Sequence, residues 1–433
     1  MKFRTSMQRR QFLASAAAGI AAPVLLGPQM HAQDRQGQGP NNRITLGFIG
    51  IGMMGRGHLQ SFLGNRGVQV VAVSDVHRIR LQDAVERVHR AYAAERKAGT
   101  YRGCESYNDF RELLGRRDID AVVIATPDHW HAIPAILAAR SRKDVYCEKP
   151  LSLTIYEARA MVRAARDNHV VFQTGSQQRT EFSGHFRKAV EYVRSGRIGR
   201  VRTVRVGVRA PNRPCDLAAE QTPEGIDWEM WNGPSPARGF SHVLCPLDIH
   251  SHFPAWRNYR EYAGGLLADM GAHHFDIAQW ALDMDHSAPT EIHPPERGDT
   301  GLRFVYANGI EMFHGGPIDC RFEGADGRID VGRGGISSTP AAILQQPLGE
   351  RDFHLPAVAA NHRQNWLDCI RTRRQPVADV EIGARSAQVC HLANIGYQLR
   401  RMLRWDPVRE EFVDNAEANR LRYRENRPPW NQM

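Results

Sequence analysis

Two stretches of the chain carry side chains that can move a proton or hold a charge beside a substrate. The first is "GGLLADMGAHHFDIAQWAL", residues 264–282, which is expected to form a helix from near Leu267. Asp269, His273 and Asp276 then lie at intervals of four and three along one face of that helix. A histidine between two carboxylates is held in one tautomer, and its protonated form is stabilised. The pattern predicts a base that collects a proton near neutral pH; the alternative is an ion-pair ladder on a solvated surface.

The second stretch is Glu148-Lys149-Pro150, at the end of the apolar strand expected over "KDVYCEKP". A single ammonium between an apolar strand and a proline rarely has a purely structural task. Residues 126–131, "TPDHWH", follow the strand expected over "IDAVVIATP" in the same way. Because ligands bind at the carboxyl ends of parallel strands, both places are expected to lie over a bound ligand. For His131, packing against neighbouring side chains explains the residue equally well.

A glycine-rich turn indicates what that ligand is. Gly50-x-Gly52-x-x-Gly55 follows an apolar strand over 44–49 and opens a helix, as in dinucleotide-binding folds. Asp75 ends the next strand, where a carboxylate accepts hydrogen bonds from the adenosine ribose and repels a 2'-phosphate. NAD is therefore expected, while Arg78 and Arg80 leave NADP open as the less favoured cofactor.

Aromatic residues and histidines gather just before the helix expected from Leu267, in "IDWEMWNGP" (226–234) and "HSHFPAWRNYREY" (250–262). Aromatic faces with a few fixed polar groups suit sugar rings, but they equally suit an ordinary core. A zinc site from His250, His252, His273 and Asp269 would lack a known ligand spacing, so no metal is expected.

The elements that must position these residues form two domains of different architecture. Over residues 43–174, helices alternate with apolar strands, which predicts an α/β Rossmann domain with a doubly wound parallel sheet. Over 175–433, the hairpin signals Asn308-Gly309 and Asp326-Gly327 predict an α+β substrate-binding domain on an open, mostly antiparallel sheet, followed by C-terminal helices and a tail. An open sheet face favours a homo-oligomer, a dimer or a tetramer.

The N-terminal segment has the features of an export signal. Residues 1–32 include Arg9-Arg10 before a short apolar run, which fits the twin-arginine route to the periplasm, and residues 33–42 form a polar linker. The apolar run is too short for a membrane anchor. Four basic residues here account for part of the formal net charge of +10, and the remaining basic residues are scattered. Scattered arginine argues against nucleic-acid binding.

The ordered set of motifs resembles the Gfo/Idh/MocA family, the group of glucose-fructose oxidoreductase and inositol dehydrogenase. The resemblance rests on the glycine fingerprint, Asp75, "YNDFRELL", "ATPDHWH", Glu148-Lys149-Pro150 and the "GG-x-x-x-D-x-x-x-H" that ends in Asp269 and His273. It extends to the exported twin-arginine branch of the family. Asp128 stands where an asparagine is common, and the C-terminal tail is longer than in the soluble dehydrogenases.

The resemblance implies a role for each matching residue. Lys149 would stabilise the alkoxide that develops on the reacting hydroxyl, His273 would take its proton, and Asp269 would orient His273 or bind a neighbouring hydroxyl. The residues expected to contact the cofactor are Gly50, Ile51, Gly52, Met53, Met54, Gly55, Asp75, Thr126, Pro127, His131, Glu148 and Lys149. Those expected to contact a small carbohydrate substrate are His129, Trp130, Gln178, Arg257 and Asp276.

Three functions fit these features. The first is an NAD-dependent oxidoreductase that transfers a hydride from a hydroxyl of a sugar, glycoside or cyclitol. The second is a redox-neutral glycosidase, in which a resident NAD oxidises the ring, allows elimination and is regenerated on the product. The third is a sugar-binding protein without turnover, which the intact Lys149, Asp269 and His273 argue against. Because an exported protein has no NAD pool at hand, tightly bound NAD is expected.

Overall fold

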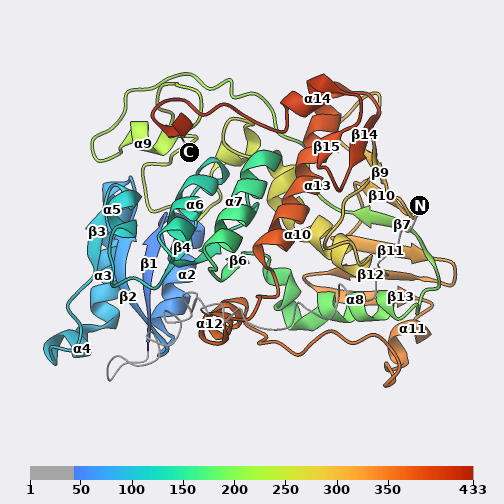
Figure 1. Ribbon diagram of the computed structural model, residues 1–433, viewed down its shortest axis with the longest axis horizontal. Helices are drawn as coiled ribbons and strands as arrows, with labels where there is room; N and C mark the ends of the chain where they lie inside the picture. Colours follow the sequence, from blue (N-terminus) through green and yellow to red (C-terminus); the bar gives the residue numbers. More distant parts are fainter. Residues whose placement is uncertain (1–42, 433) are drawn as a thin grey trace, which may run out of the picture. The chain divides into compact units, whose positions relative to one another are not determined.

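The computed structural model describes residues 43–432, so the predicted signal and linker lie outside the described residues. The first domain is built on a six-stranded, wholly parallel sheet of order β3-β2-β1-β4-β5-β6 (Figure 1). Its strands are β1 (Ile44–Ile49), β2 (Val68–Ser74), β3 (Glu105–Tyr107), β4 (Ala121–Ile124), β5 (Asp144–Cys147) and β6 (Phe172–Thr174). This sheet confirms the predicted Rossmann architecture, in which the strands are apolar because both faces are covered.

The helices of this domain follow the predicted alternation with small differences. They are α2 (Met53–Leu63), α3 (Arg78–Ala91), α4 (Ala93–Lys97), α5 (Phe110–Leu114), α6 (Ala132–Arg140) and α7 (Ile155–Asp167). The charged stretch from His77 to Arg96 forms two helices, α3 and α4, because the chain leaves helical geometry at Tyr92. Helix α7 begins with a capping box, because Thr154 accepts from the Glu157 amide and the Glu157 carboxylate accepts from the Thr154 amide.

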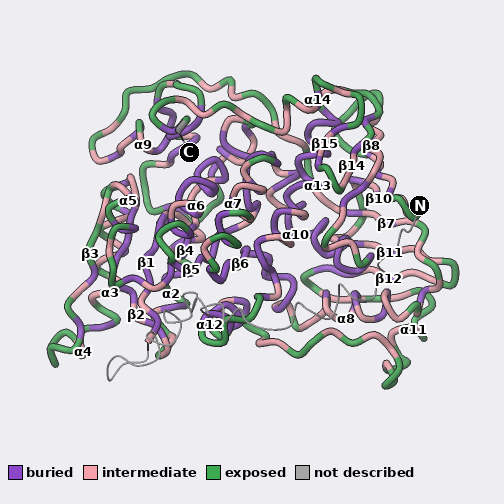
Figure 2. Tube along the Cα trace, viewed as in Figure 1, coloured by how far each residue is buried: buried purple, intermediate pink, exposed green. Residues whose placement is uncertain are grey.

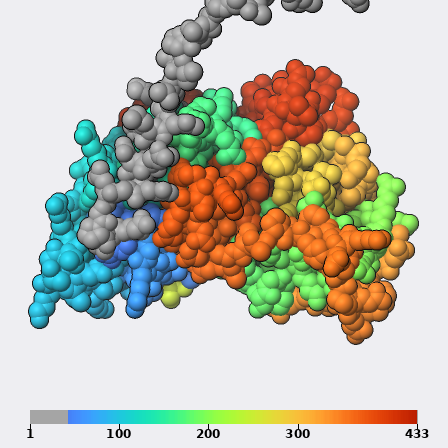
Figure 3. All heavy atoms as spheres, turned by 60° about the horizontal axis from the view of Figure 1, so that its bottom comes forward, coloured from blue at the N-terminus to red at the C-terminus, as the bar shows by residue number. Residues whose placement is uncertain are grey.

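Chain from the second half returns to complete the core of the first domain. Helix α12 (His362–Thr372) contributes the fully buried Trp366, which packs against Phe62 and Tyr146. Its Gln364 accepts from the Asn65 side chain beyond the end of α2, and Figure 3 shows this part of the chain beside the first domain. Residues far along the sequence therefore contact α2, the helix that follows the glycine fingerprint.

The second domain is built on a nine-stranded sheet of order β13-β12-β11-β7-β10-β9-β8-β14-β15. All its pairs are antiparallel except β7 with β10, so the predicted mostly antiparallel sheet is confirmed. Both predicted hairpins form, at Asn308-Gly309 and Asp326-Gly327. The strands are β7 (Val201–Val206), β8 (Glu291–His293), β9 (Arg303–Val305), β10 (Glu311–His314), β11 (Cys320–Gly324), β12 (Arg328–Gly332), β13 (Gly335–Thr339), β14 (Leu403–Asp406) and β15 (Glu411–Phe412).

One face of this sheet packs on three helices, α8 (His185–Arg194), α10 (Gly265–Ala281) and α13 (Val380–Leu399). Helices α10 and α13 are buried along most of their length (Figure 2), which is why their apolar residues show little preference for one side. The other face carries half-buried ion pairs such as Arg321 with Asp330. Self-association through that face stays a prediction. Short helices α11 (Ala342–Gln345) and α14 (Ala416–Arg420) lie at the periphery.

Residues 213–263 form a third, smaller core beside the first sheet. It is rich in aromatic side chains, with Trp228 stacked on Trp231 in α9 (Trp228–Asn232) and Tyr262 against Trp231. Backbone hydrogen bonds join it to the end of β2, because the Asp227 amide donates to the Val76 carbonyl at 2.9 Å. The ordinary core explanation therefore holds for most of these aromatic residues.

Candidate functional site

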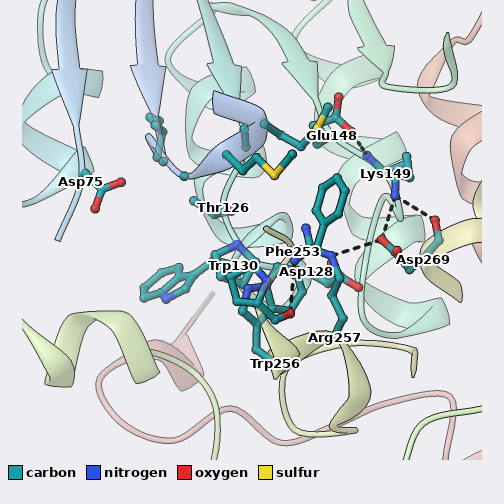
Figure 4. A pocket seen from close by; sticks show the side chains of 18 of the residues that line it. Asp75, Thr126, Asp128, Trp130, Glu148, Lys149, Phe253, Trp256, Arg257 and Asp269 are labelled. Carbon is teal, nitrogen blue, oxygen red and sulfur yellow. Dashed lines mark hydrogen bonds and ion pairs between the residues drawn. The ribbon is translucent and has the colours of Figure 1, made fainter. Parts of the chain in front are cut away.

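A cavity of about 340 Å³ lies where the carboxyl ends of the first sheet meet α10 and the segment around residue 250. This volume falls within the range of small-ligand pockets. In Figure 4, Asp75 lies at one end of the cavity, and Lys149 and Asp269 lie at the other. Its lining includes most of the residues singled out from the sequence: Gly50, Gly52, Met53, Met54, Asp75, Thr126, Pro127, Trp130, Glu148, Lys149, Arg257, Asp269 and His273.

The fingerprint end has the shape that a dinucleotide phosphate needs. Gly50 has φ +87°, and a Cβ there would meet the Thr126 amide nitrogen at 2.8 Å. A Cβ on Gly55 would meet the Gly50 carbonyl oxygen at 2.1 Å, so only glycine permits this packing of helix on strand. A Cβ on Gly52 would meet no atom within 4 Å, and no side chain caps the start of α2. The first amides of α2 are therefore open to an anion.

Asp75 is fixed at its end of the cavity (Figure 4) by the backbone around it. Its Oδ2 accepts from the Ile51 amide at 2.6 Å and its Oδ1 from the His77 amide at 2.8 Å. Each carboxylate oxygen retains a lone pair for a ribose hydroxyl. Ile51 contributes this backbone contact while its side chain is buried, and Gly55 acts through close packing; neither lines the cavity.

Two polar side chains in the middle of the cavity differ in their hydrogen bonding: Thr126 has no partner, and Glu148 has several. The Thr126 hydroxyl is buried and has no hydrogen-bond partner, which fits a cofactor contact at this position. Glu148 accepts from His58 and from Gln177, each at 2.7 Å. Burial raises the pKa of Glu148, but His58, Lys149 and Gln177 outweigh it and lower the pKa to about 2. Glu148 is therefore a fixed negative charge beneath the cofactor site.

At the opposite end, Lys149 is held by a residue from the second domain. Its Nζ donates to the Asp269 Oδ1 and to the Asp269 carbonyl oxygen, both at 2.8 Å (Figure 4). Arg257 donates to the same Oδ1 at 3.4 Å and stacks on Trp256 and Phe253. Burial raises the pKa of Asp269, but Lys149 and Arg257 outweigh it and hold the pKa below its usual value. The pair is charged and faces the cavity.

His273 lines the cavity, but its surroundings differ from those expected. Its Nδ1 is buried without a hydrogen-bond partner, so the ring is not clamped between Asp269 and Asp276. Burial, together with the positive charge of Lys149, lowers the pKa of His273 well below its usual value. The prediction of a stabilised imidazolium is therefore wrong: His273 is a neutral imidazole, with a free nitrogen that can accept a proton.

Asp276 belongs to a buried ion-pair cluster and does not line the cavity. Its carboxylate accepts two hydrogen bonds from Arg179 at 2.8 Å and one from Ser386 at 2.7 Å, and Arg179 also pairs with Asp285. The Asp276 side chain is completely buried. The expected substrate contact is corrected for this reason, because every direction of approach is occupied by protein.

Three more expected contacts lie behind the cavity wall. The His129 Nε2 donates to the Trp231 carbonyl oxygen at 3.0 Å, so this nitrogen carries the proton. His131 bridges the Pro150 and Thr126 carbonyl oxygens and thereby ties the two strand-end loops together. Gln178 is fully buried, and neither end of its amide has a partner. None of the three is in the cavity lining, and all three side chains are buried in protein.

Two residues that line the cavity, Asp128 and Arg363, were not predicted from the sequence to contact a ligand. Asp128, the departure from the family's common asparagine, lines the cavity, and burial together with Asp269 raises its pKa to about 7. Arg363 arrives from α12 and donates to the His58 Nδ1 at 3.0 Å, which fixes the proton of His58 on the nitrogen that faces Glu148. No local pattern around Arg363 marks it, because only tertiary packing brings α12 here.

The chain matches two family models over most of its length. Residues 44–176 match the model described as an oxidoreductase family's NAD-binding Rossmann fold, and residues 213–432 match the model of that family's C-terminal alpha/beta domain. Myo-inositol 2-dehydrogenase of Thermotoga maritima is 26% identical over 83% of this chain and 96% of its own. Two other curated relatives are matched over only about half of their length, 56% and 55%.

A shorter part of the chain is similar to a protein that is named as a glycosyl hydrolase. Glycosyl hydrolase family 109 protein 1 of Shewanella sp. (strain ANA-3) is 34% identical over 37% of each chain. Among solved structures, levoglucosan dehydrogenase in complex with NADH and levoglucosan has a TM-score of 0.55 at 19% identity, over 86% of this chain and all of that one. At that identity the likeness concerns the fold.

Proposed function

The chain belongs to the Gfo/Idh/MocA oxidoreductase family, and on this premise we propose that it oxidises a hydroxyl of a sugar, glycoside or cyclitol. The observation that carries the proposal is the pairing of Lys149 with Asp269 beside the neutral His273, in the same cavity as the dinucleotide fingerprint. Lysine and histidine from different domains thus meet where a hydroxyl next to a nicotinamide would lie.

NAD, when bound, supplies the hydride acceptor for this oxidation. The ammonium of Lys149 can donate a third hydrogen bond to the substrate oxygen, because two of its three protons are already taken by Asp269. That bond strengthens as the oxygen becomes negative. His273 lines the same cavity and can receive the hydroxyl proton, and Asp269 keeps Lys149 aimed at the oxygen. Trp130, Arg257 and Trp256 form the surrounding wall for the sugar ring.

We further propose that the cofactor is NAD, tightly held, and that the protein acts in the periplasm. Asp75 faces the cavity with lone pairs available to a ribose diol, and a carboxylate there opposes a 2'-phosphate. The twin-arginine segment supports export of a folded protein with its cofactor in place. A resident cofactor then has to be restored on the protein or by a partner.

A second candidate, the redox-neutral glycosidase, is favoured by Asp128. Oxidation followed by elimination and re-reduction needs proton transfers at a ring carbon and at the leaving oxygen, in addition to the one at the oxidised hydroxyl. Asp128 has a pKa of about 7 and faces the same cavity, so the site has a second group that can give or take a proton near neutral pH. The partial match to a glycosyl hydrolase family 109 protein supports the same candidate.

One experiment tests both candidates. The full protein is purified and denatured, and the released nicotinamide is measured; intact protein is then supplied with glycosides and cyclitols without added cofactor. A single burst of bound NADH supports the dehydrogenase, whereas many turnovers with release of the aglycone support the glycosidase. The Lys149→Ala and His273→Ala variants should lose either reaction. A fully active double variant would overturn the site assignment.

A further inference from the structure

Residues 243–254, here called the strap, cross the cavity opposite the dinucleotide fingerprint. The strap has no helix or strand. Its Leu244, Pro246, His250, Phe253 and Pro254 line the same cavity as Gly50, Gly52, Met53 and Asp75. The strap therefore forms the wall that would face a dinucleotide bound on the fingerprint, and Figure 4 shows its Phe253 inside the cavity.

Three basic side chains of the first domain bind the strap by its backbone carbonyls. Arg80 donates to the Pro246 carbonyl at 2.5 Å and to the Asp248 carbonyl at 3.4 Å. His77 contacts the Leu247 carbonyl at 3.1 Å, and Arg56 donates to the His250 carbonyl. Arg56 lies in the first turn of α2, and Arg80 in the first turn of α3. We call these three side chains the latch; it ties four backbone carbonyls of the strap, at positions 246, 247, 248 and 250, to the starts of α2 and α3.

The latch brings like charges together at a partly buried place. Arg80 is only 6% exposed, and the Arg56 Nη1 is buried without a partner. Burial, followed by the charge of Arg80, lowers the pKa of Arg56. Asp75 and Asp83 oppose this effect only in part. An anion held at the start of α2 would relieve the repulsion between the two guanidinium groups, so a bound pyrophosphate and a closed latch stabilise each other.

We propose that the strap and its latch retain the dinucleotide, so that NAD leaves only when Arg56, His77 and Arg80 release the strap. The proposal rests on the NAD binding in the proposed function and names the residues that make it slow to exchange. It also gives Arg80 a task other than binding a 2'-phosphate, since its guanidinium is already engaged by two carbonyls. The favoured cofactor on this account is NAD.

The test measures the release of bound nucleotide, with no substrate present. Full-length protein is loaded with NADH, and its dissociation into excess NAD is followed by the fluorescence of the bound nucleotide. Arg80→Ala and Arg56→Ala should each speed release at least tenfold, and the double variant should lose its nucleotide during dialysis. Arg90→Ala is the matched control on the same helix; Arg90 is exposed and is not part of the cavity lining, so release should be unchanged.

Limited proteolysis provides a second measurement if an alanine variant folds poorly. Arg80→Lys keeps the charge but loses the planar fork of the guanidinium, so it should expose the strap to cleavage while its melting temperature stays near that of the parent. Equal release and equal cleavage in all variants would overturn the strap proposal. Protein that binds no nucleotide under any condition would instead overturn the proposed function, so the two failures are distinguishable.

Discussion

Asp269 and Asp276 lie two turns apart on α10, yet their carboxylates meet different surroundings. Asp269 is 21% exposed, faces the cavity and binds Lys149 and Arg257. Asp276 is 0% exposed and is saturated by Arg179 and Ser386. An acid that borders a cavity can share its partner with a ligand, whereas one enclosed by protein can only hold the fold together. Of two residues on one helix face, one is therefore available to a ligand and the other only stabilises the fold.

The strongest test of this contrast is Asp269→Asn. Without the negative charge, Lys149 is no longer held at the cavity, and we expect kcat/KM to fall about 1,000-fold, or about 4 kcal/mol of transition-state stabilisation. The free energy of unfolding should change little, because the carboxylate borders an open space. Steady-state kinetics and urea unfolding on the same preparation check both parts. A variant that unfolds easily but keeps its rate would reverse the roles assigned to the two aspartates.

Asp276→Asn should show the opposite behaviour. Arg179 is 1% exposed and would keep only Asp285 as its charged partner, so we expect the free energy of unfolding to drop by about 3 kcal/mol. The protein that remains folded should keep its KM, since Asp276 does not reach the cavity. Chemical denaturation followed by tryptophan fluorescence measures the loss. A changed KM at full stability would mean that a substrate does contact Asp276.

Asp128 lies between these extremes, and its effect depends on pH. Its pKa is raised from its ordinary value to about 7 by burial and by Asp269, so the folded chain keeps a proton that the unfolded chain releases between about pH 4 and pH 7. Stability from this group is therefore lost as the pH rises through that window. Asp128→Asn should remove the slope and gain about 4 kcal/mol at pH 8 relative to pH 4. Parallel stability profiles for the parent and the variant would contradict the shift.

Ser386→Ala is the mildest change in the buried cluster. It removes one hydrogen bond to Asp276, at 2.7 Å, while Arg179 stays in place. We expect a loss of about 1 kcal/mol in the free energy of unfolding and no change in kcat/KM. Thermal unfolding and kinetics would detect it. If this variant lost as much stability as Asp276→Asn, the ion pair with Arg179 would contribute little.

Local patterns predicted much of the fold and one end of the site. Both hairpins depend on residues within a few positions of one another, and the parallel sheet on the alternation of apolar strands with helices; all are present. The glycine fingerprint is also predictable from local sequence, because a single turn of backbone creates the space for a phosphate. The periodicity of α10 was less informative. It correctly put Asp276 on the same helix face as His273, but it could not show that Arg179 and Ser386 enclose the Asp276 carboxylate.

The sequence by itself determined the family, the two sheet architectures and the residue types available for chemistry, because these depend on short-range spacing and on the order of motifs. Only the tertiary structure decided which side chains pair. Lys149 donates to Asp269, Arg179 donates to Asp276, and Arg363 donates to His58. Those pairs are 97 or more positions apart along the chain. Burial and the nearest charge set the state of each group, and both are properties of packing that spacing along the chain does not encode.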